Sequence, residues 1–134
     1  MLAGGVTACE SKFQATVALS STKAEFTAAA KAGKTTLYLR SIPQELGYAQ
    51  HTPTTLCIDD RGALFMANAE QPTRRTRHMD TKNFAMQHWT KEEHMMLKPI
   101  ATQDNASDHF TKALGRTKFH KQTDVTMGRR NPNV

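Results

Sequence analysis

The stretch from Thr22 to about Ile42 keeps one periodicity for longer than any other part of the chain, and it constrains the fold most strongly. Alanines, Leu39 and Ile42 recur in it at helical spacing, and the next residue, Pro43, ends or kinks helices. Residues 16–30 lead into this segment: they begin with apolar side chains, continue with hydroxyl-bearing ones and end in alanines. The chain therefore has to bury one side of a single long helix.

A compact apolar strand is predicted over Thr54–Ile58, and it leads straight into Asp59 and Asp60. The residues from Asp60 to Ala69 indicate a short helix, because an aspartate near a helix start suits the helix dipole. A carboxylate at the C-terminal end of a strand lies where open α/β sheets place their ligands. These elements predict an α/β fold with a candidate site after the strand.

The remaining predicted elements are shorter. They are a strand over Val6–Lys12, a helix that places Met79, Met86 and Trp89 on one core-facing side, a strand over His94–Ile100 and a last helix over Asp108–Leu114, which Gly115 stops. Pro99 indicates a strand at a sheet edge, because proline cannot donate to a ladder. With 134 residues and 38% apolar content, the chain is expected to form one domain.

Positive charge is concentrated in the second half of the chain. Residues 1–70 hold six Lys and Arg against six Asp and Glu, whereas residues 71–134 hold twelve against six, so the whole net charge of +6 lies there. A basic half beside an acidic pocket suits a polyanion that is held by its phosphates and cut at a metal site. The alternative is a solvated basic surface without a ligand.

Cys9 and Cys57 stand far apart, without a Cys-x-x-Cys pair. This spacing indicates neither a zinc site nor a disulfide framework, so we expect both to be small buried side chains. No run approaches the roughly 18 apolar residues that span a bilayer, and the first residues lack the basic and apolar regions of a signal peptide. A cytoplasmic or nuclear location is expected by default.

Three carboxylates stand at the starts or ends of predicted elements, namely Glu25, Asp59 and Asp108. Cleavage of a phosphodiester with two magnesium ions needs several carboxylates that converge on one point, because Mg²⁺ takes carboxylate oxygens. Each residue also has a purely structural interpretation. The spacing Thr22-x-x-Glu25 fits a capping box, and Asp59 and Asp108 fit helix caps or turns.

The residues around these carboxylates resemble the ribonuclease H domain of copia-type retrotransposon polyproteins. Val-Ala-Leu-Ser-Ser-Thr-x-Ala-Glu-Phe (17–26) is similar to the signature that opens the first helix of that domain. Four further segments resemble the family's motifs in the family's order: Leu-Tyr-Leu-Arg-Ser-Ile-Pro-Gln-Glu-Leu-Gly (37–47), Thr-Thr-Leu-Cys-Ile-Asp-Asp-Arg-Gly-Ala-Leu (54–64), Arg-Thr-Arg-His-Met-Asp (75–80) and Asn-Ala-Ser-Asp-His-Phe-Thr-Lys-Ala-Leu (105–114). The resemblance runs from Gly4 to about Phe119, which implies that the domain covers residues 1–119 and that residues 120–134 are a basic tail.

This resemblance implies a ribonuclease H-like mixed sheet with flanking helices, lacking the first strand and most of the second. It also implies hydrolysis of the RNA strand of RNA–DNA hybrids with two Mg²⁺ ions, for which Glu25, Asp59 and Asp108 are the catalytic and metal-binding residues. The family's first catalytic aspartate lies on the first strand, upstream of a Gly-Gly turn that matches residues 4–5, and no residue here corresponds to it. We therefore expect the isolated chain to be impaired in catalysis. Asp60 stands where the family usually has asparagine, which adds a negative charge beside Asp59.

A nucleic-acid partner implies basic side chains that contact phosphate, and we assign this role to Arg74, Arg75, Arg77, His78, Lys82 and Lys112. For His78 the alternative is a residue that starts a helix and bonds a backbone group. The alternative function is a non-catalytic domesticated fragment that serves as a nucleic-acid-binding or structural subunit. In that case we expect the chain to be ordered mainly within a protein assembly or oligomer that supplies the missing strand.

Overall fold

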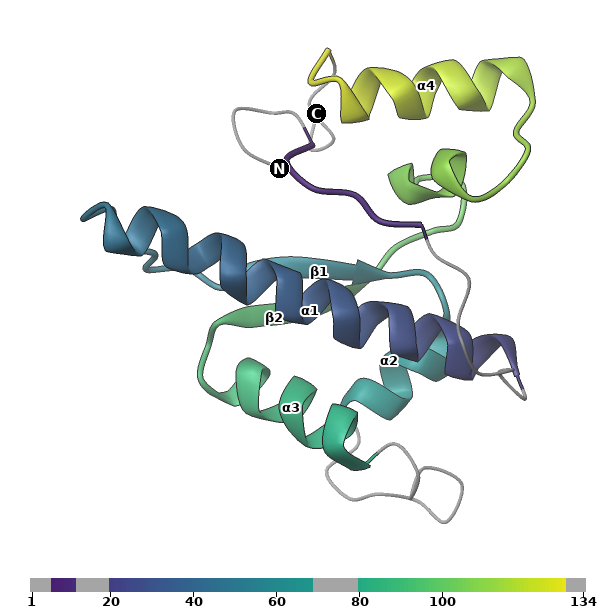
Figure 1. The fold of residues 1–134 in the computed structure, drawn as a ribbon. Coiled ribbons are helices and arrows are strands. Elements are labelled where there is room, and N and C mark those ends of the chain that lie inside the picture. Colours follow the sequence, from purple (N-terminus) through teal and green to yellow (C-terminus); the bar gives the residue numbers. More distant parts are fainter. Residues whose placement is uncertain (1–5, 12–19, 69–79, 130–134) are drawn as a thin grey trace. The chain divides into compact units, whose positions relative to one another are not determined.

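The computed structural model describes residues 6–11, 20–68 and 80–129, which fall into two compact units. The helix–sheet unit lies within Thr16–Pro99, and the terminal unit combines residues from Met1–Ala15 and Ile100–Val134. The helix–sheet unit contains α1 (Ser21–Glu45), β1 (Thr54–Ile58), α2 (Arg61–Asn68), α3 (Asp80–Lys91) and β2 (Met95–Pro99), and the terminal unit contains the 3-10 helix η2 (Ala106–Phe110) and α4 (Arg116–Thr126) (Figure 1). Helices combined with parallel strands agree with the predicted α/β class.

Helix α1 begins after Ser20, which has an extended backbone and whose side-chain oxygen accepts a hydrogen bond from the Lys23 N–H at 3.2 Å. The capping box of Thr22 and Glu25, which was the structural alternative for Glu25, does not form, because the helix starts earlier and Glu25 lies in its second turn. At the other end, Pro43 lies within the last turn, and the helix stops two residues later. Gly47 closes this end at a φ of 85°, a left-handed conformation that glycine adopts without strain.

Arg40 fixes the loop that leads from α1 to β1. Its guanidinium donates to the carbonyl oxygens of Thr52 at 2.8 Å and Gln50 at 3.1 Å, and to the Thr54 Oγ1 at 2.8 Å. A guanidinium presents several donors in a rigid fork, so one side chain can hold three acceptors of a short loop. The start of β1 is thereby tied to the second half of α1.

The two strands pair in parallel, in a register that runs from Thr54 opposite Met95 to Ile58 opposite Pro99. Parallel strands need a long crossover between them, and α2 and α3 lie in that connection (Figure 1). Within the described residues the sheet contains these two strands, and β2 lies inside the strand predicted over His94–Ile100. The strand predicted over Thr54–Ile58 is also confirmed.

The core of the helix–sheet unit lies between α1, the sheet and the two crossover helices. Its fully or nearly buried members are Phe26, Ala29 and Ala30 of α1, Ala63 and Ala67 of α2, Met86 of α3, and Ile58 and Met95 of the strands. Gly33 lets α1 approach closely, because a Cβ at that position would lie 3.0 Å from the Trp89 ring and 3.2 Å from the Met86 sulfur. The predicted core positions of Met86 and Trp89 are therefore confirmed, whereas Met79 lies outside the described residues.

The terminal unit departs most from the predicted elements. The last helix predicted over Asp108–Leu114 is wrong, because the helical turn there is η2, which Asn105 caps and which stops at Thr111 with a φ of −126°. Gly115 does not stop a helix but stands at the N-terminal cap of α4, which crosses the boundary expected between residues 119 and 120. Residues 6–11 form no strand, and the Val6 N–H instead donates to the carbonyl of Thr126, the last residue of α4, at 3.0 Å.

Candidate functional site

The carboxylate that most clearly organises the structure is Asp60, directly after β1. Its Oδ1 accepts a hydrogen bond from the Ala63 N–H at 2.7 Å, which caps the N-terminus of α2, and its Oδ2 accepts one from the Thr22 hydroxyl of α1 at 3.3 Å. A carboxylate at a helix start is stabilised by the unpaired N–H groups there. Asp60 thus joins the first turn of α1, the end of β1 and the start of α2.

Gly62 makes this junction possible. A Cβ at position 62 would lie 2.8 Å from the Thr22 Cγ2, which is closer than real Cβ atoms approach, and 3.1 Å from the Asp60 Oδ1, which is a tight contact. Thr22 therefore reaches Asp60 only because position 62 carries no side chain. The segment Asp59-Asp60-Arg61-Gly62 combines a capping acid with the glycine that lets α1 come near it.

Glu25 and Asp59, two of the three predicted catalytic residues, belong to the elements that this junction connects. Glu25 is exposed and lies three residues after Thr22, a spacing that puts two residues on the same side of a helix. Asp59 is partly buried and precedes Asp60 at the end of β1. The hydrogen bond of Thr22 with Asp60 brings the start of α1 to the end of β1. Glu25 and Asp59 therefore both lie near this hydrogen bond in the sequence of their elements.

Asp108, the third predicted catalytic residue, is the centre of a buried ion pair in the terminal unit. It is 3% exposed, and its two oxygens accept hydrogen bonds from Lys112 at 2.8 Å and Lys118 at 3.1 Å. Burial acts to raise the pKa of Asp108, but the hydrogen bonds and positive charges of the two lysines outweigh it and hold the pKa below its ordinary value. The carboxylate is therefore ionised and already neutralised within its own unit.

The basic residues assigned to phosphate contacts are mostly beyond what the structure describes. Arg74, Arg75, Arg77 and His78 lie outside the described residues, as does the side chain of Lys82. Lys112 is described, and its ammonium pairs with Asp108. The sequence contains a signal for this pair that we did not use, because Asp108 and Lys112 stand four residues apart, a spacing typical of ion pairs on helical turns.

In the described ranges, no three Asp, Glu, His or Cys side chains come together as a group that could hold a metal ion. Glu25 and Asp59 carry carboxylate oxygens, the type of hard ligand that Mg²⁺ prefers. Asp108 fits this role less directly, because both of its oxygens accept lysine hydrogen bonds. A cation at Asp108 would have to compete with at least one ammonium group.

Both cysteines are exposed, which corrects the prediction that they are buried. Cys57 lies between Leu56 and Ile58 on β1, and because neighbouring strand residues point to opposite faces, the packing of Leu56 and Ile58 into the core turns the thiol outward. Cys9 lies in the segment 6–11, opposite residues of η2. The sequence alone did not indicate the exposure of Cys57, because Leu56, Cys57 and Ile58 form a continuous apolar run.

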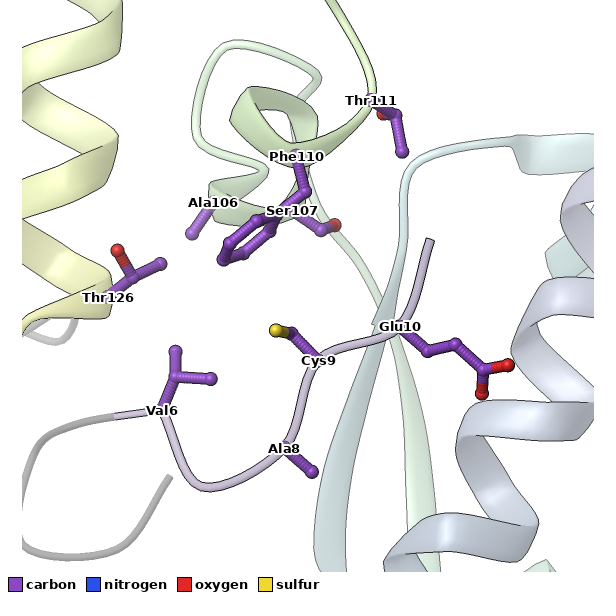
Figure 2. Close-up of a pocket in the computed structure, with 9 residues that line it drawn as sticks. All are labelled: Val6, Ala8, Cys9, Glu10, Ala106, Ser107, Phe110, Thr111 and Thr126. Atoms are coloured by element: carbon purple, nitrogen blue, oxygen red, sulfur yellow. The ribbon is translucent and has the colours of Figure 1, made fainter. Parts of the chain in front are cut away.

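The terminal unit contains an open cavity of about 260 Å³. The side chains around it come from residues 6–11, η2 and the end of α4: Val6, Ala8, Cys9, Glu10, Ala106, Ser107, Phe110, Thr111 and Thr126. Figure 2 shows the Cys9 sulfur directed toward the Phe110 ring and the Glu10 carboxylate directed away from both. The cavity is smaller than typical small-molecule sites, and it includes none of the predicted catalytic residues.

No helix in the described segments has both the length and the apolar character needed to cross a bilayer.

Over 116 residues, the chain is 34% identical to the retrovirus-related Pol polyprotein from transposon TNT 1-94 of Nicotiana tabacum. The matched region makes up 87% of this chain and 9% of the tobacco protein, so the chain spans a small part of that relative's length. No protein-family model matches the chain, and no solved structure matches it. The comparison confirms the resemblance at the level of the polyprotein: most of this chain is similar to a segment of a copia-type retrotransposon Pol polyprotein.

Proposed function

We propose that the chain is a segment of a ribonuclease H-like domain from a retrotransposon Pol polyprotein, a lineage that hydrolyses the RNA strand of RNA–DNA hybrids. The observation that carries this proposal is the junction of Thr22 with Asp60, which brings the helix bearing Glu25 to the end of the strand that Asp59 follows. Similarity to the tobacco polyprotein over most of the chain supports the same lineage.

In this proposal Glu25, Asp59 and Asp108 are the residues that would hold Mg²⁺, and the metal would activate a water and stabilise the leaving oxygen. Asp60 positions Asp59 indirectly, since it fixes the end of β1 between the starts of α1 and α2. Lys112 and Lys118 keep Asp108 ionised. For Asp108 to accept a cation, one of these lysines has to leave the carboxylate.

A fluorescently labelled RNA–DNA hybrid tests the proposal in Mg²⁺. Because no residue of the sequence matches the lineage's first catalytic aspartate, we expect the 134-residue chain alone not to cleave. A chimera that adds an aspartate-bearing first strand of the kind found in copia-type ribonuclease H domains in front of the chain should cleave the RNA strand. Asp59→Asn in the chimera should abolish cleavage, whereas Asp124→Asn, a matched carboxylate change in α4, should not.

Two outcomes would contradict the catalytic proposal. In the first, the folded chimera does not cleave. In the second, cleavage persists unchanged in the Asp59→Asn variant. Circular dichroism should confirm that each variant keeps its helices, so that loss of activity is not loss of fold.

A second candidate function is sequence-independent nucleic-acid binding without catalysis. The observation that favours binding is the excess of twelve Lys and Arg over six Asp and Glu in residues 71–134. The pairing of Asp108 with two lysines, which neutralises this carboxylate without a metal, favours the absence of catalysis. Binding of the chain to a labelled hybrid should then weaken steeply with salt, with a slope of about 0.7–0.9 for each phosphate neutralised. Asp59→Asn should bind equally well or slightly better, because it removes a negative charge. No binding at low salt would contradict this candidate.

A further inference from the structure

The second half of α1 carries large apolar side chains that the helix–sheet unit does not cover. Tyr38, Ile42 and Leu46, which we call the outer stripe, are 67%, 42% and 71% exposed, and Tyr48 in the following turn is 69% exposed. In Figure 1 the last turns of α1 extend past the ends of β1 and β2. Apolar surface gathered in this way is typical of an interaction site.

The outer stripe lies opposite the buried side of the same helix. Its members are four residues apart, so they follow one side of α1. Ile42 comes sixteen residues after the buried Phe26, which at 3.6 residues per turn places it about 160° around the helix axis. Residues on the buried side hold α1 against the core, and the outer stripe therefore faces away from that core.

The surface is also held in place. Arg40 ties this part of α1 to the loop before β1 through three hydrogen bonds, and that loop leaves the outer stripe exposed. A surface that is fixed before binding loses little conformational entropy when a partner docks. The end of α1 is thus a preformed apolar surface.

Charged residues beside the outer stripe indicate what kind of partner fits. Lys34 and Glu45 are both exposed and stand eleven residues apart, which puts them within about 20° of each other along one flank of the stripe. The midpoint between Lys34 and Glu45 nearly coincides with the midpoint between Tyr38 and Ile42. A two-fold axis at this midpoint would place Lys34 opposite Glu45 of the partner subunit and Tyr38 opposite Ile42 of the partner subunit.

We infer that the outer stripe binds a second copy of this chain, with the two α1 helices antiparallel. Four side chains at the observed exposures present about 500 Å² per copy, so a pair buries about 1,000 Å², near the lower limit for a specific interface. This size favours a weak dimer, with a dissociation constant of about 100 μM. Leu46 then covers the aliphatic stem of Lys34 of the partner subunit.

Sedimentation equilibrium over about 10–500 μM chain tests this inference. A reductant is needed, because Cys9 and Cys57 are exposed. The average mass of the wild type should rise with concentration toward that of a dimer. Ile42→Glu should raise the dissociation constant at least about tenfold, because it places a charge in the buried interface. Phe65→Glu is the matched control, because Phe65 of α2 is 69% exposed but lies outside the outer stripe. A mass that stays monomeric throughout, or a dimer that Ile42→Glu leaves intact, would overturn the inference.

Mixing two charge variants tests the antiparallel arrangement itself. Lys34→Glu makes both flanking positions acidic and Glu45→Lys makes both basic, so each variant alone should dimerise about fivefold more weakly than wild type. An equimolar mixture should recover wild-type association, because each acidic position then faces a basic one in the other chain. If the mixture stays as weak as the separate variants, the antiparallel pairing is wrong.

Discussion

Replacing Asp108 by asparagine removes the charge at the centre of the terminal unit and tests what this carboxylate does. Asp108 is 3% exposed and holds Lys112 and Lys118 at 2.8 and 3.1 Å. A hydrogen bond to a charged group contributes about 1.5–3 kcal/mol. The lysine side chains are 52% and 33% exposed, so both regain water and the loss is moderated. We expect Asp108→Asn to lower the free energy of unfolding of the terminal unit by about 2 kcal/mol.

Hydrogen exchange of the α4 amides measures this loss of stability, because α4 belongs to the terminal unit. A change of about 2 kcal/mol corresponds to about a thirtyfold decrease in protection. Lys121→Met is the matched control, because the pair of Lys121 with Asp104 is about half exposed and contributes at most about 0.5 kcal/mol. Unchanged or increased protection in Asp108→Asn would refute the reasoning, since the lysine contacts would then not stabilise the unit.

The pH dependence gives the same test a second readout. The pKa of Asp108 is lower in the folded chain than its ordinary value of 3.8, so the unfolded chain binds more protons in the window below about pH 4. Stability therefore rises with pH through that window. The contribution of Asp108 to stability is complete above its ordinary pKa, and it is lost as the pH falls through the lower pKa that Asp108 has in the folded chain. The helix signal of the wild type should show this acid loss, and Asp108→Asn should lack it.

Three further substitutions test other contacts by chemical denaturation. Gly62→Ala should destabilise the helix–sheet unit by about 1–3 kcal/mol, because its Cβ would press on Thr22, whereas Gly115→Ala, with open space around it, should cost at most about 0.5 kcal/mol. Asp60→Ala should cost about 1 kcal/mol through loss of the α2 cap, and Asp60→Asn should retain most of it; equal losses would contradict the capping role. Gln122→Met should stabilise the terminal unit by about 1 kcal/mol, because the buried Gln122 amide makes no hydrogen bond within the described residues; a loss of stability would show that the amide has a partner in solution.

The parts of the fold that the sequence predicted well are those in which periodicity and apolar burial agree. The strand from Thr54 to Ile58 is a short apolar run before two acids, and β2 ends at Pro99, which cannot donate to a ladder. Met86 and Trp89 pack on the core as their spacing predicts. In these segments, local pattern and tertiary packing favour the same structure.

Helix α4 was not predicted because its stabilisation is not local. Arg116–Thr126 has little apolar periodicity, and its fully buried residue is the polar Gln122. Lys118 reaches Asp108 and the Thr102 carbonyl from across the turn at Gly115, a pairing that no fixed spacing indicates. The capping of α1 was missed for a different reason, since Ser20 and Thr22 are both good caps and only the contact with Asp60 assigns Thr22 elsewhere.

The hydrogen bonds of Arg40 have a consequence for the order in which the helix–sheet unit folds. They join residues 10–14 positions apart, whereas Thr54 and Met95, which open the β1–β2 register, are 41 positions apart. Closing the longer loop costs about 1 kcal/mol more in chain entropy, so α1 should dock the start of β1 before β2 arrives. Arg40→Met should then slow folding, while a destabilising change in β2 should mainly speed unfolding.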